Sequence, residues 1–418
     1  MKLHIESDRT LIRSASSSTR YVRVSFTAPD ARRHERRLPI NVALVLDRSG
    51  SMAGGKLDLA RQAAERALAL LHADDRFAVV VYDDRVEVVT PSATATGEAR
   101  ARAADLLHGI EPRGSTDLGS GWLNGCEQVG RGVSEESIGR CLLLTDGLAN
   151  RGITDRGELS HHAAELRARG VATSTFGVGD DFDERLLQAM AEAGGGNSYY
   201  LRDATRISEF LESEIGEALE VVARDAALVV ELPQGATAKP LGRQRARQTG
   251  RTLRVELEHL VSGQELELVL ALRFPTGADG GSVSARFVLE DREGVLDAAP
   301  EHLSWTYASH AENDRQRRTI AVDRVVARLY AARARADALD LNRDGDLEGA
   351  RRVLRATAKR IRSYAGEDRE LLDLAKRLEH DSERYSETVL SAPLAKEAAY
   401  LNFAVARSRA PDGKARRS

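Results

Sequence analysis

The chain has 418 residues and a net charge of −3, from 61 Lys and Arg against 64 Asp and Glu. That length predicts two or three domains, and 42% hydrophobic with 30% charged residues is typical of a globular protein rather than a disordered or membrane-embedded one. The near-neutral balance argues against a dedicated nucleic-acid binder, which carries a strongly basic surface.

Neither a membrane span nor a disulfide framework is expected from the sequence. No apolar run approaches the roughly 18–20 residues that cross a bilayer. The first residues, MKLHIESDRT, contain no apolar stretch behind Lys2, so we expect no secretory signal. Two cysteines, Cys126 and Cys141, are too few for a disulfide scaffold. We therefore expect a cytoplasmic protein, and its oligomeric state stays open.

Residues 1–38 are expected to form two or three short strands. Val22, Val24 and Phe26 alternate with polar neighbours, which is the period of a half-buried strand. The charged segment Pro29–Arg37 is typical of a loop.

Residues 39–222 alternate between short apolar runs and helical stretches. The apolar runs are Ile40–Leu46, Phe77–Val81, Cys141–Leu144 and Val171–Phe176. The helical stretches are Leu57–Leu71, Gly97–Leu107, Leu118–Gly130, Leu159–Arg169 and Glu184–Ala193. This alternation predicts an α/β domain with a doubly wound, mostly parallel sheet covered by helices on both faces. Val86–Thr90 follows Phe77–Tyr82 after a short turn, so we expect it to be an antiparallel edge strand.

Residues 223–310 return to the two-residue alternation of strands. Apolar positions alternate within three stretches, at 253–257, 266–274 and 283–287, and turn-forming segments separate them. This pattern predicts part of a β-sandwich. Because three or four strands make a thin sandwich, we expect residues 1–38 to supply the missing strands. The α/β domain would then be an insertion within the sandwich.

Residues 311–406 are expected to form a helical hairpin or bundle. Three apolar stripes at helical spacing begin near Val322, Leu347 and Leu371. The segment Asp340–Glu348 resembles the start of a calcium loop, but Arg351 stands where such a loop needs a glutamate. A helix–turn–helix, with Gly345 in the turn and Asp346 as a cap, is the favoured alternative to a weak Ca²⁺ site. Residues 407–418 are predicted to be a disordered basic tail.

Three oxygen-rich segments lie where strands end or helices begin in the α/β domain. Asp47, Ser49 and Ser51 follow the first apolar run, Thr116 precedes a helix, and Asp146 follows another apolar run. Parallel strands bring such segments to one edge of the sheet, where hard cations such as Mg²⁺ find oxygen ligands. Each segment alone could be a turn or a helix cap, so it is the set that predicts a metal site.

This set resembles a von Willebrand factor A domain with a metal-ion-dependent adhesion site. The resemblance is carried by NVALVLDRSGSM, GSTDLGSG, LLLTDG and FGVGDDFDERLLQAMAEAGGGNSYYL, within residues 39–222. The flanking regions resemble, more loosely, bacterial proteins in which a β-sandwich and a C-terminal helical segment bracket such a domain. Inter-α-trypsin inhibitor heavy chains and calcium-activated chloride channel regulators are more distant relatives of similar layout.

The resemblance implies which residues bind the ion. Asp47, Ser49 and Ser51 would ligate it directly or through water, Thr116 would bind it directly in the ligand-bound state, and Asp146 would lie close, partly through water. Asp117 is a weaker candidate that could only support its loop. The resemblance implies Mg²⁺, or Mn²⁺ or Ca²⁺, with an open position that accepts an Asp or Glu carboxylate from a protein partner.

The sequence therefore predicts a metal-dependent protein-interaction module in a bacterial assembly or signalling system, not an enzyme. The alternative is a non-catalytic adaptor or regulatory subunit of an enzyme complex, associated with an AAA+ ATPase or a Ser/Thr kinase or phosphatase. A hydrolase acting through the metal lacks a visible base beside the site. Gly50–Lys56 fits the GxxxxGK pattern of nucleotide-binding loops, but Leu57 stands where Ser or Thr is needed.

Overall fold

The computed structural model describes residues 1–31, 37–410 and 412–417, and these fall into two compact units. Unit 1 comprises residues 1–33, 221–391 and 401–418; unit 2 comprises residues 34–220 and 392–400. The chain thus begins in unit 1, runs through unit 2 and returns to unit 1, as the sequence predicts for an inserted α/β domain. Part of the predicted loop at Pro29–Arg37 lies outside the described residues.

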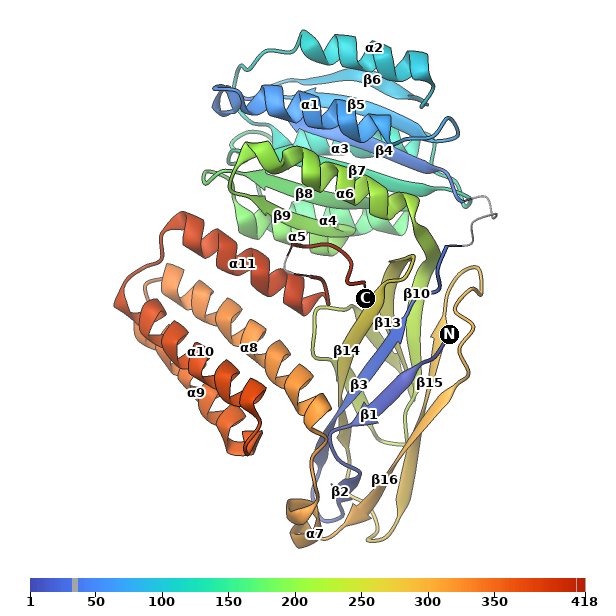
Figure 1. Cartoon of the computed structure of the whole chain (residues 1–418), viewed down its shortest axis with the longest axis vertical. Helices are drawn as coiled ribbons and strands as arrows, with labels where there is room; N and C mark the ends of the chain where they lie inside the picture. The colour runs from blue at the N-terminus through green and yellow to red at the C-terminus, as the bar shows by residue number, and fades with distance from the viewer. Residues whose placement is uncertain (32–36, 411, 418) are drawn as a thin grey trace. The chain divides into compact units, whose positions relative to one another are not determined.

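Unit 2 is built on one six-stranded sheet with the order β6-β5-β4-β7-β8-β9 (Figure 1). The strands are β4 (Ile40–Asp47), β5 (Arg76–Tyr82), β6 (Val86–Thr94), β7 (Ile138–Thr145), β8 (Val171–Val178) and β9 (Gly195–Leu201). All neighbours are parallel except β5 and β6, which form the predicted antiparallel hairpin at the edge. Every residue of β4 and β8 is buried, as expected for interior parallel strands. The buried residues include a few polar ones, Asn41 in β4 and Thr173, Ser174 and Thr175 in β8.

Helices cover both faces of this sheet, as predicted for a doubly wound fold (Figure 1). They are α1 (Lys56–Ala69), α2 (Gly97–His108), α3 (Leu118–Gly130), α4 (Arg156–Ala168), α5 (Glu184–Gly194) and α6 (Ile207–Leu219), with short 3₁₀ turns at Gly50–Met52 and Ala204–Arg206. Side-chain caps fix where several begin: the carboxylate of Asp155 accepts the backbone N–H of Glu158, so α4 starts three residues before the predicted Leu159.

Unit 1 contains two sheets that share a core. Their orders are β1-β3-β14-β11 and β12-β13-β10-β15-β16-β2. The strands are β1 (His4–Ser7), β2 (Leu11–Arg13), β3 (Ser18–Thr27), β10 (Val221–Glu231), β11 (Thr237–Pro240), β12 (Ala246–Thr249), β13 (Thr252–Val261), β14 (Glu265–Phe274), β15 (Ser282–Glu290) and β16 (Glu301–Ala308). Val24 and Leu270 of one sheet and Val230, Phe287 and Trp305 of the other belong to one apolar cluster.

The N-terminal strands complete this sandwich, as the sequence predicts. β3 pairs with β14 along ten residues in antiparallel register, and β1 pairs with β3. β2 adds to the other sheet by a parallel pairing with β16. The N-terminal segment therefore contributes to both layers, because a chain that alternates polar and apolar residues needs a partner sheet to bury its apolar face.

A helical region follows the sandwich. Its helices are α7 (His310–Arg315), α8 (Ile320–Arg343), α9 (Leu347–Ala365), α10 (Arg369–Glu387) and α11 (Ala392–Ala406). Val322, Val325 and Leu329 of α8 pack on Val269 of β14, which confirms the first predicted stripe. None of the helices in the described residues is long and apolar enough to cross a membrane.

The turn between α8 and α9 is the predicted helix–turn–helix. Gly345 has a φ of 81°, in the left-handed region that glycine adopts without strain. The carboxylate of Asp346 accepts the backbone N–H of Gly349 at 2.8 Å and caps α9.

The C-terminal end of the chain differs from the prediction in two ways. Residues 392–400 belong to unit 2, where the Lys396 ammonium lies 3.0 Å from the Glu184 carboxylate and over the Phe182 ring. Residues 407–418, predicted to be disordered, form defined contacts in their described part, such as the 2.6 Å ion pair between Arg407 and Glu258. The composition suggested disorder because it does not reveal which acidic residues of the strands lie close to the basic residues of this segment. Pro411 and Ser418 lie outside the described residues.

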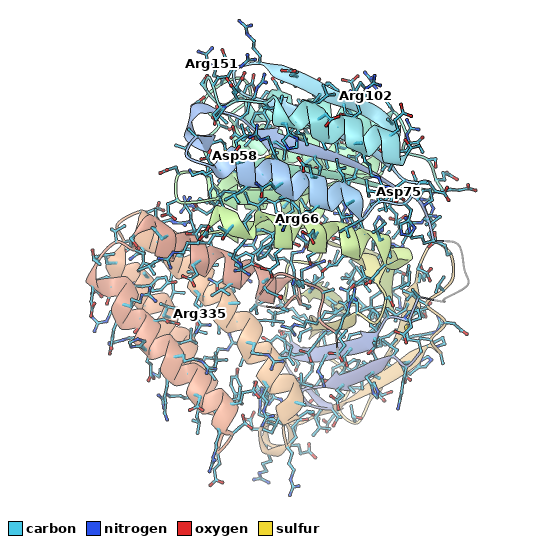
Figure 2. The ribbon with its side chains drawn as sticks, turned by 45° about the horizontal axis from the view of Figure 1, so that its top comes forward. Asp58, Arg66, Asp75, Arg102, Arg151 and Arg335 are labelled. Carbon is cyan, nitrogen blue, oxygen red and sulfur yellow. The ribbon has the colours of Figure 1, made fainter. Side chains whose placement is uncertain are left out.

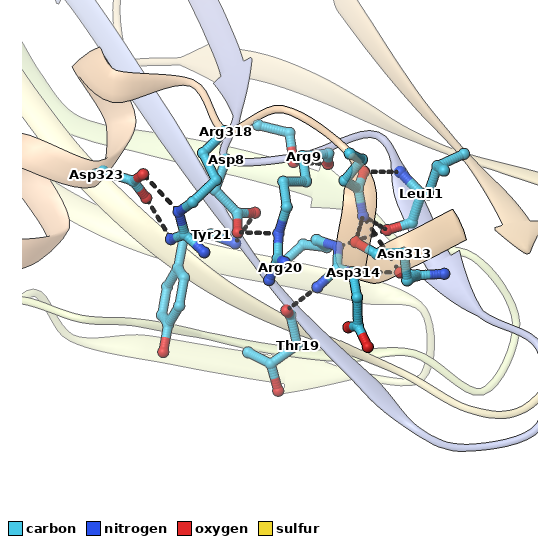
Figure 3. Close-up of polar contacts among 12 residues, drawn as sticks. Asp8, Arg9, Leu11, Thr19, Arg20, Tyr21, Asn313, Asp314, Arg318 and Asp323 are labelled. Atoms are coloured by element: carbon cyan, nitrogen blue, oxygen red, sulfur yellow. Dashed lines mark hydrogen bonds and ion pairs between the residues drawn. The ribbon is translucent and has the colours of Figure 1, made fainter. Parts of the chain in front are cut away.

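A buried polar network in unit 1 connects the N-terminal strands to the start of the helical region (Figure 3). Asp8 accepts the backbone N–H of Tyr21 at 2.9 Å, and Arg20 donates to the Asn313 side chain at 2.6 Å. Arg318 forms a two-bond ion pair with Asp323, which is fully buried. Burial raises the pKa of Asp8 despite the Tyr21 hydrogen bond and the charge of Arg20, so the network is held together against a desolvation cost.

Replacing Arg318 with Met should lower the free energy of unfolding of unit 1. The substitution leaves the buried Asp323 carboxylate without its cation, and because Arg318 is partly exposed we expect a loss of about 2–3 kcal/mol. Urea unfolding, monitored by the fluorescence of Trp305, measures this loss of stability. The experiment uses a Trp122→Phe background, in which Trp305 is the sole tryptophan.

Arg13→Met is the matched control. Arg13 also pairs with an aspartate, Asp314, but both side chains are exposed, so its loss should cost no more than about 0.5 kcal/mol. Equal effects of the two substitutions would contradict a stabilising role for the buried pair.

Candidate metal centre

The predicted oxygen donors meet at the carboxyl edge of the sheet in unit 2. β4 ends at Asp47, and its neighbour β7 ends at Thr145, immediately before Asp146. The two strands pair in parallel with Leu46 opposite Leu144, so both aspartates emerge at the same edge. Asp47 and Asp146 are fully buried.

The loop after β4 folds around the Asp47 carboxylate. One carboxylate oxygen accepts the backbone N–H of Ser49 at 2.8 Å, and the other accepts the Thr145 hydroxyl at 2.7 Å. The turn at Gly50–Met52 then brings the Ser51 hydroxyl within 3.0 Å of the Ser49 hydroxyl. Ser51 is exposed, so this end of the site faces solvent.

The Asp146 carboxylate is the second acidic centre. Its Oδ1 accepts the Ser51 hydroxyl at 2.6 Å, and its Oδ2 lies 2.5 Å from the Lys56 ammonium. Lys56 was not among the predicted site residues. The sequence feature that could have pointed to Lys56 is its place at the end of the GxxxxGK string, which begins within the DxSxS segment.

Thr116 reaches the same place from a third loop. A Cβ built on Gly147 would lie 3.4 Å from the Ser51 hydroxyl and 3.5 Å from the Thr116 hydroxyl, so both hydroxyls lie close to Gly147. Asn150 holds the Thr116 backbone, accepting its N–H at 3.0 Å through the side chain. Asp117 instead caps α3 by accepting the Ser120 N–H, which fits the supporting role considered for it.

Asp83, at the turn after β5, links the loops that carry these donors. Its buried carboxylate accepts from Arg48 at 2.8 Å and from Arg113 at 2.8 Å, and its backbone carbonyl accepts the Asp117 N–H. Burial alone raises the pKa of Asp83, but hydrogen bonds from Arg113 and the Arg85 N–H and the charge of Arg48 outweigh it and lower the pKa. The sequence showed only a hairpin turn here, because these arginine contacts join segments far apart along the chain.

The electrostatics of the site favour a bound cation. The pKa of Asp47 is raised from 3.8 to about 6, mainly by burial and in smaller part by the negative charge of Asp146, while hydrogen bonds from Ser49 and Thr145 partly offset the rise. Two buried carboxylates at one sheet edge are therefore mutually unfavourable when both are ionised. Lys56 compensates one of these charges.

The donor chemistry fits a hard divalent cation. The set consists of two carboxylates and three hydroxyls, all oxygen, which are the ligands of Mg²⁺, Mn²⁺ and Ca²⁺. Within the described ranges of the chain, no group of three or more His, Cys, Asp and Glu side chains is arranged to hold a metal.

Asp47→Asn should stabilise the protein at pH 8 in the presence of EDTA. The folded-state pKa of Asp47 lies above its ordinary value of 3.8, so the wild-type protein loses stability as pH rises from about 4 through about 6. A pKa shift of about two units corresponds to a loss of about 2–3 kcal/mol in the free energy of unfolding of the wild-type protein. The variant has no charge at this position and does not lose this stability.

Thermal unfolding of both proteins at pH 4 and pH 8 measures this effect. We expect similar stability at pH 4 and a more stable variant at pH 8. A variant that is less stable by the same amount at both values would show that the charge of Asp47 does not change between them, and would contradict the raised pKa.

Comparisons with known proteins agree with the fold. Residues 41–213 match the model of the von Willebrand factor type A domain. Among solved structures, a von Willebrand factor type A protein from Catenulispora acidiphila aligns over 96% of both chains, with a TM-score of 0.74 and 18% identity. The ArnB paralog VWA2 from Sulfolobus acidocaldarius aligns over 98% of both chains, with a TM-score of 0.63 and 15% identity. At these identities the likeness is one of fold.

Sequence relatives include uncharacterised bacterial proteins. The protein sll0103 of Synechocystis is 30% identical over 278 residues, which are 64% of each chain. YfbK of Escherichia coli is 30% identical over 213 residues, 50% of this chain and 36% of that protein. The matched region thus spans less than two thirds of either relative. The human inter-alpha-trypsin inhibitor heavy chain H1 is 30% identical over 190 residues, 21% of its length. Residues 41–213 therefore match a von Willebrand factor type A domain, and the chain has bacterial homologues.

Proposed function

We propose that this protein is a metal-dependent protein-interaction module. Asp47, Ser49, Ser51, Thr116 and Asp146 would bind Mg²⁺, or Mn²⁺ or Ca²⁺, and a partner would present an Asp or Glu carboxylate to the ion. The observation that carries this proposal is the convergence of five oxygen-bearing side chains from three loops on one edge of the sheet. Domains of this family generally serve adhesion or protein interaction, which supports the proposal.

The charge of the donor set suits a site shared with a partner. Two carboxylates balance the two charges of the ion, and the three hydroxyls add none. When bound, the ion supplies a positively charged position that is completed by an oxygen from outside the chain. The exposed Ser51 lies on the solvent side of the site, where such an oxygen can arrive.

The protein itself fixes the donors before any ligand arrives. The Ser49 N–H and the Thr145 hydroxyl orient both oxygens of Asp47, and Asn150 fixes the backbone of Thr116. Asp83 holds the loops together through Arg48 and Arg113. A preorganised site of this kind loses less conformational entropy on binding.

The surface beside the donors offers an apolar contact. Leu148 follows Gly147 directly and is 56% exposed, although large apolar side chains are usually buried. We propose that an acidic residue of the partner binds at the ion while a neighbouring apolar residue contacts Leu148. This is a binding role without a catalytic step, and none of the relatives named above carries the name of an enzyme.

Isothermal titration with Mg²⁺ tests the metal site directly. We expect one Mg²⁺ per wild-type chain, and we expect Thr116→Ala and Asp47→Ala to weaken binding by about tenfold or more. Ser115→Ala is the matched control, because it removes a hydroxyl from the same loop, and the oxygen of this hydroxyl has no hydrogen-bond partner among the described residues. Mg²⁺ binding that Thr116→Ala leaves unchanged would contradict the proposed ligand set.

A pull-down from host lysate then tests the interaction. Partners should be retained by the wild-type protein with Mg²⁺ and lost with EDTA or with Thr116→Ala, because each removes the bridge to the partner carboxylate. Retention of the same proteins under all conditions would place the binding surface elsewhere.

A further inference from the structure

Lys56 is an unusual residue type for the first position of a helix. α1 begins at Lys56, where the partial positive charge of the helix N-terminus disfavours a cation. The side chain nevertheless reaches the buried Asp146 carboxylate, 2.5 Å away, and is still 33% exposed. A Cβ built on Gly179, which follows β8, would lie 4.0 Å from the ammonium. The ammonium thus lies beside the ends of two strands, within the proposed metal site.

Both oxygens of Asp146 are engaged in this arrangement. Its Oδ1 accepts the Ser51 hydroxyl and its Oδ2 the Lys56 ammonium. A divalent ion that binds this carboxylate through either oxygen therefore shares its negative charge with the ammonium and is repelled by it, unless the ammonium moves away. The ion and Lys56 thus compete for the charge of one carboxylate.

Formal charges show what this competition does. Asp47, Asp146 and Lys56 together carry −1, and a divalent ion brings the total to +1. Without Lys56 the same totals would be −2 and zero. Lys56 therefore weakens the attraction for the ion, and it leaves the loaded site with one positive charge that a carboxylate neutralises.

Building on the proposed function, we propose that Lys56 is a built-in cation that links ion binding to carboxylate binding. It competes with the divalent ion for Asp146, and once displaced its ammonium contacts the partner's carboxylate beside the ion. The site would then hold the ion weakly by itself and more tightly when an acidic ligand is present.

The effect of removing Lys56 on Mg²⁺ affinity distinguishes this proposal from a simpler role in which Lys56 only positions Asp146. If Lys56 merely positioned Asp146, its removal would weaken Mg²⁺ binding, because the carboxylate would lose its orientation. If Lys56 competes with the ion, its removal strengthens Mg²⁺ binding. Lys56→Met keeps most of the length and the apolar stem of the side chain and removes the ammonium, with its charge and its hydrogen bond to Asp146.

Titration with Mg²⁺ alone, and with Mg²⁺ at a fixed excess of acetate and constant ionic strength, measures both effects. In the absence of acetate, Lys56→Met should bind Mg²⁺ about tenfold more tightly than wild type, a value that allows for solvent screening of a partly exposed charge. Acetate should tighten Mg²⁺ binding to wild type by a larger factor than it does for Lys56→Met. Lys56→Arg keeps the charge, so its Mg²⁺ affinity and its response to acetate should be closer to those of the wild-type protein.

Arg66→Met is the control for net charge. Arg66 is exposed and lies in the last turn of the same helix, whereas Lys56 is its first residue, so the removal of Arg66 should leave both titrations unchanged (Figure 2). Weaker or unchanged Mg²⁺ binding by Lys56→Met, while wild type binds normally, would overturn the proposed role of Lys56 and leave the interaction module standing. Absence of Mg²⁺ binding in every variant, with or without acetate, would overturn both.

Discussion

The structure of unit 2 depends on the parallel pairing of β4 with β7, which ends in two buried carboxylates. Asp47 and Asp146 emerge at the same sheet edge because Leu46 and Leu144 are opposite each other in register. Burying two like charges this way is unfavourable, and the raised pKa of Asp47 reflects it. The surrounding hydroxyls, N–H groups and Lys56 are the groups through which the protein tolerates that arrangement.

The same constraint explains how the neighbouring loops are built. Asp83 binds Arg48 of one loop and Arg113 of another, so it connects the loop after β4 to the loop before α3. Asn150 ties the loop after β7 to Thr116. A second layer of polar contacts of this kind is needed because loops at a strand end lack the hydrogen bonds of the sheet itself.

Unit 1 shows how the chain accommodates an inserted domain. β3 precedes the insertion and β10 follows it, and both are interior strands, one in each sheet of the sandwich. β3 pairs with β14, which follows unit 2 in the sequence. The sandwich is therefore assembled from segments on both sides of the insertion. Residues 392–400 show that the C-terminal region also contributes to unit 2, through the buried Lys396.

The sequence by itself determined the type of the elements that have a clear periodic pattern. Short, mainly apolar runs predicted β4 and β8, two-residue alternation predicted β3, and the spacing of Val322 and Leu329 predicted the apolar face of α8, because these patterns depend only on local periodicity. The three oxygen-rich segments and the resemblance they carry also came from sequence. Only the tertiary structure decided that Lys56 binds Asp146, that Asp83 joins two loops and that Arg407 pairs with Glu258. Those contacts join residues distant in the chain, and side-chain charge pairing leaves no periodic trace in a sequence.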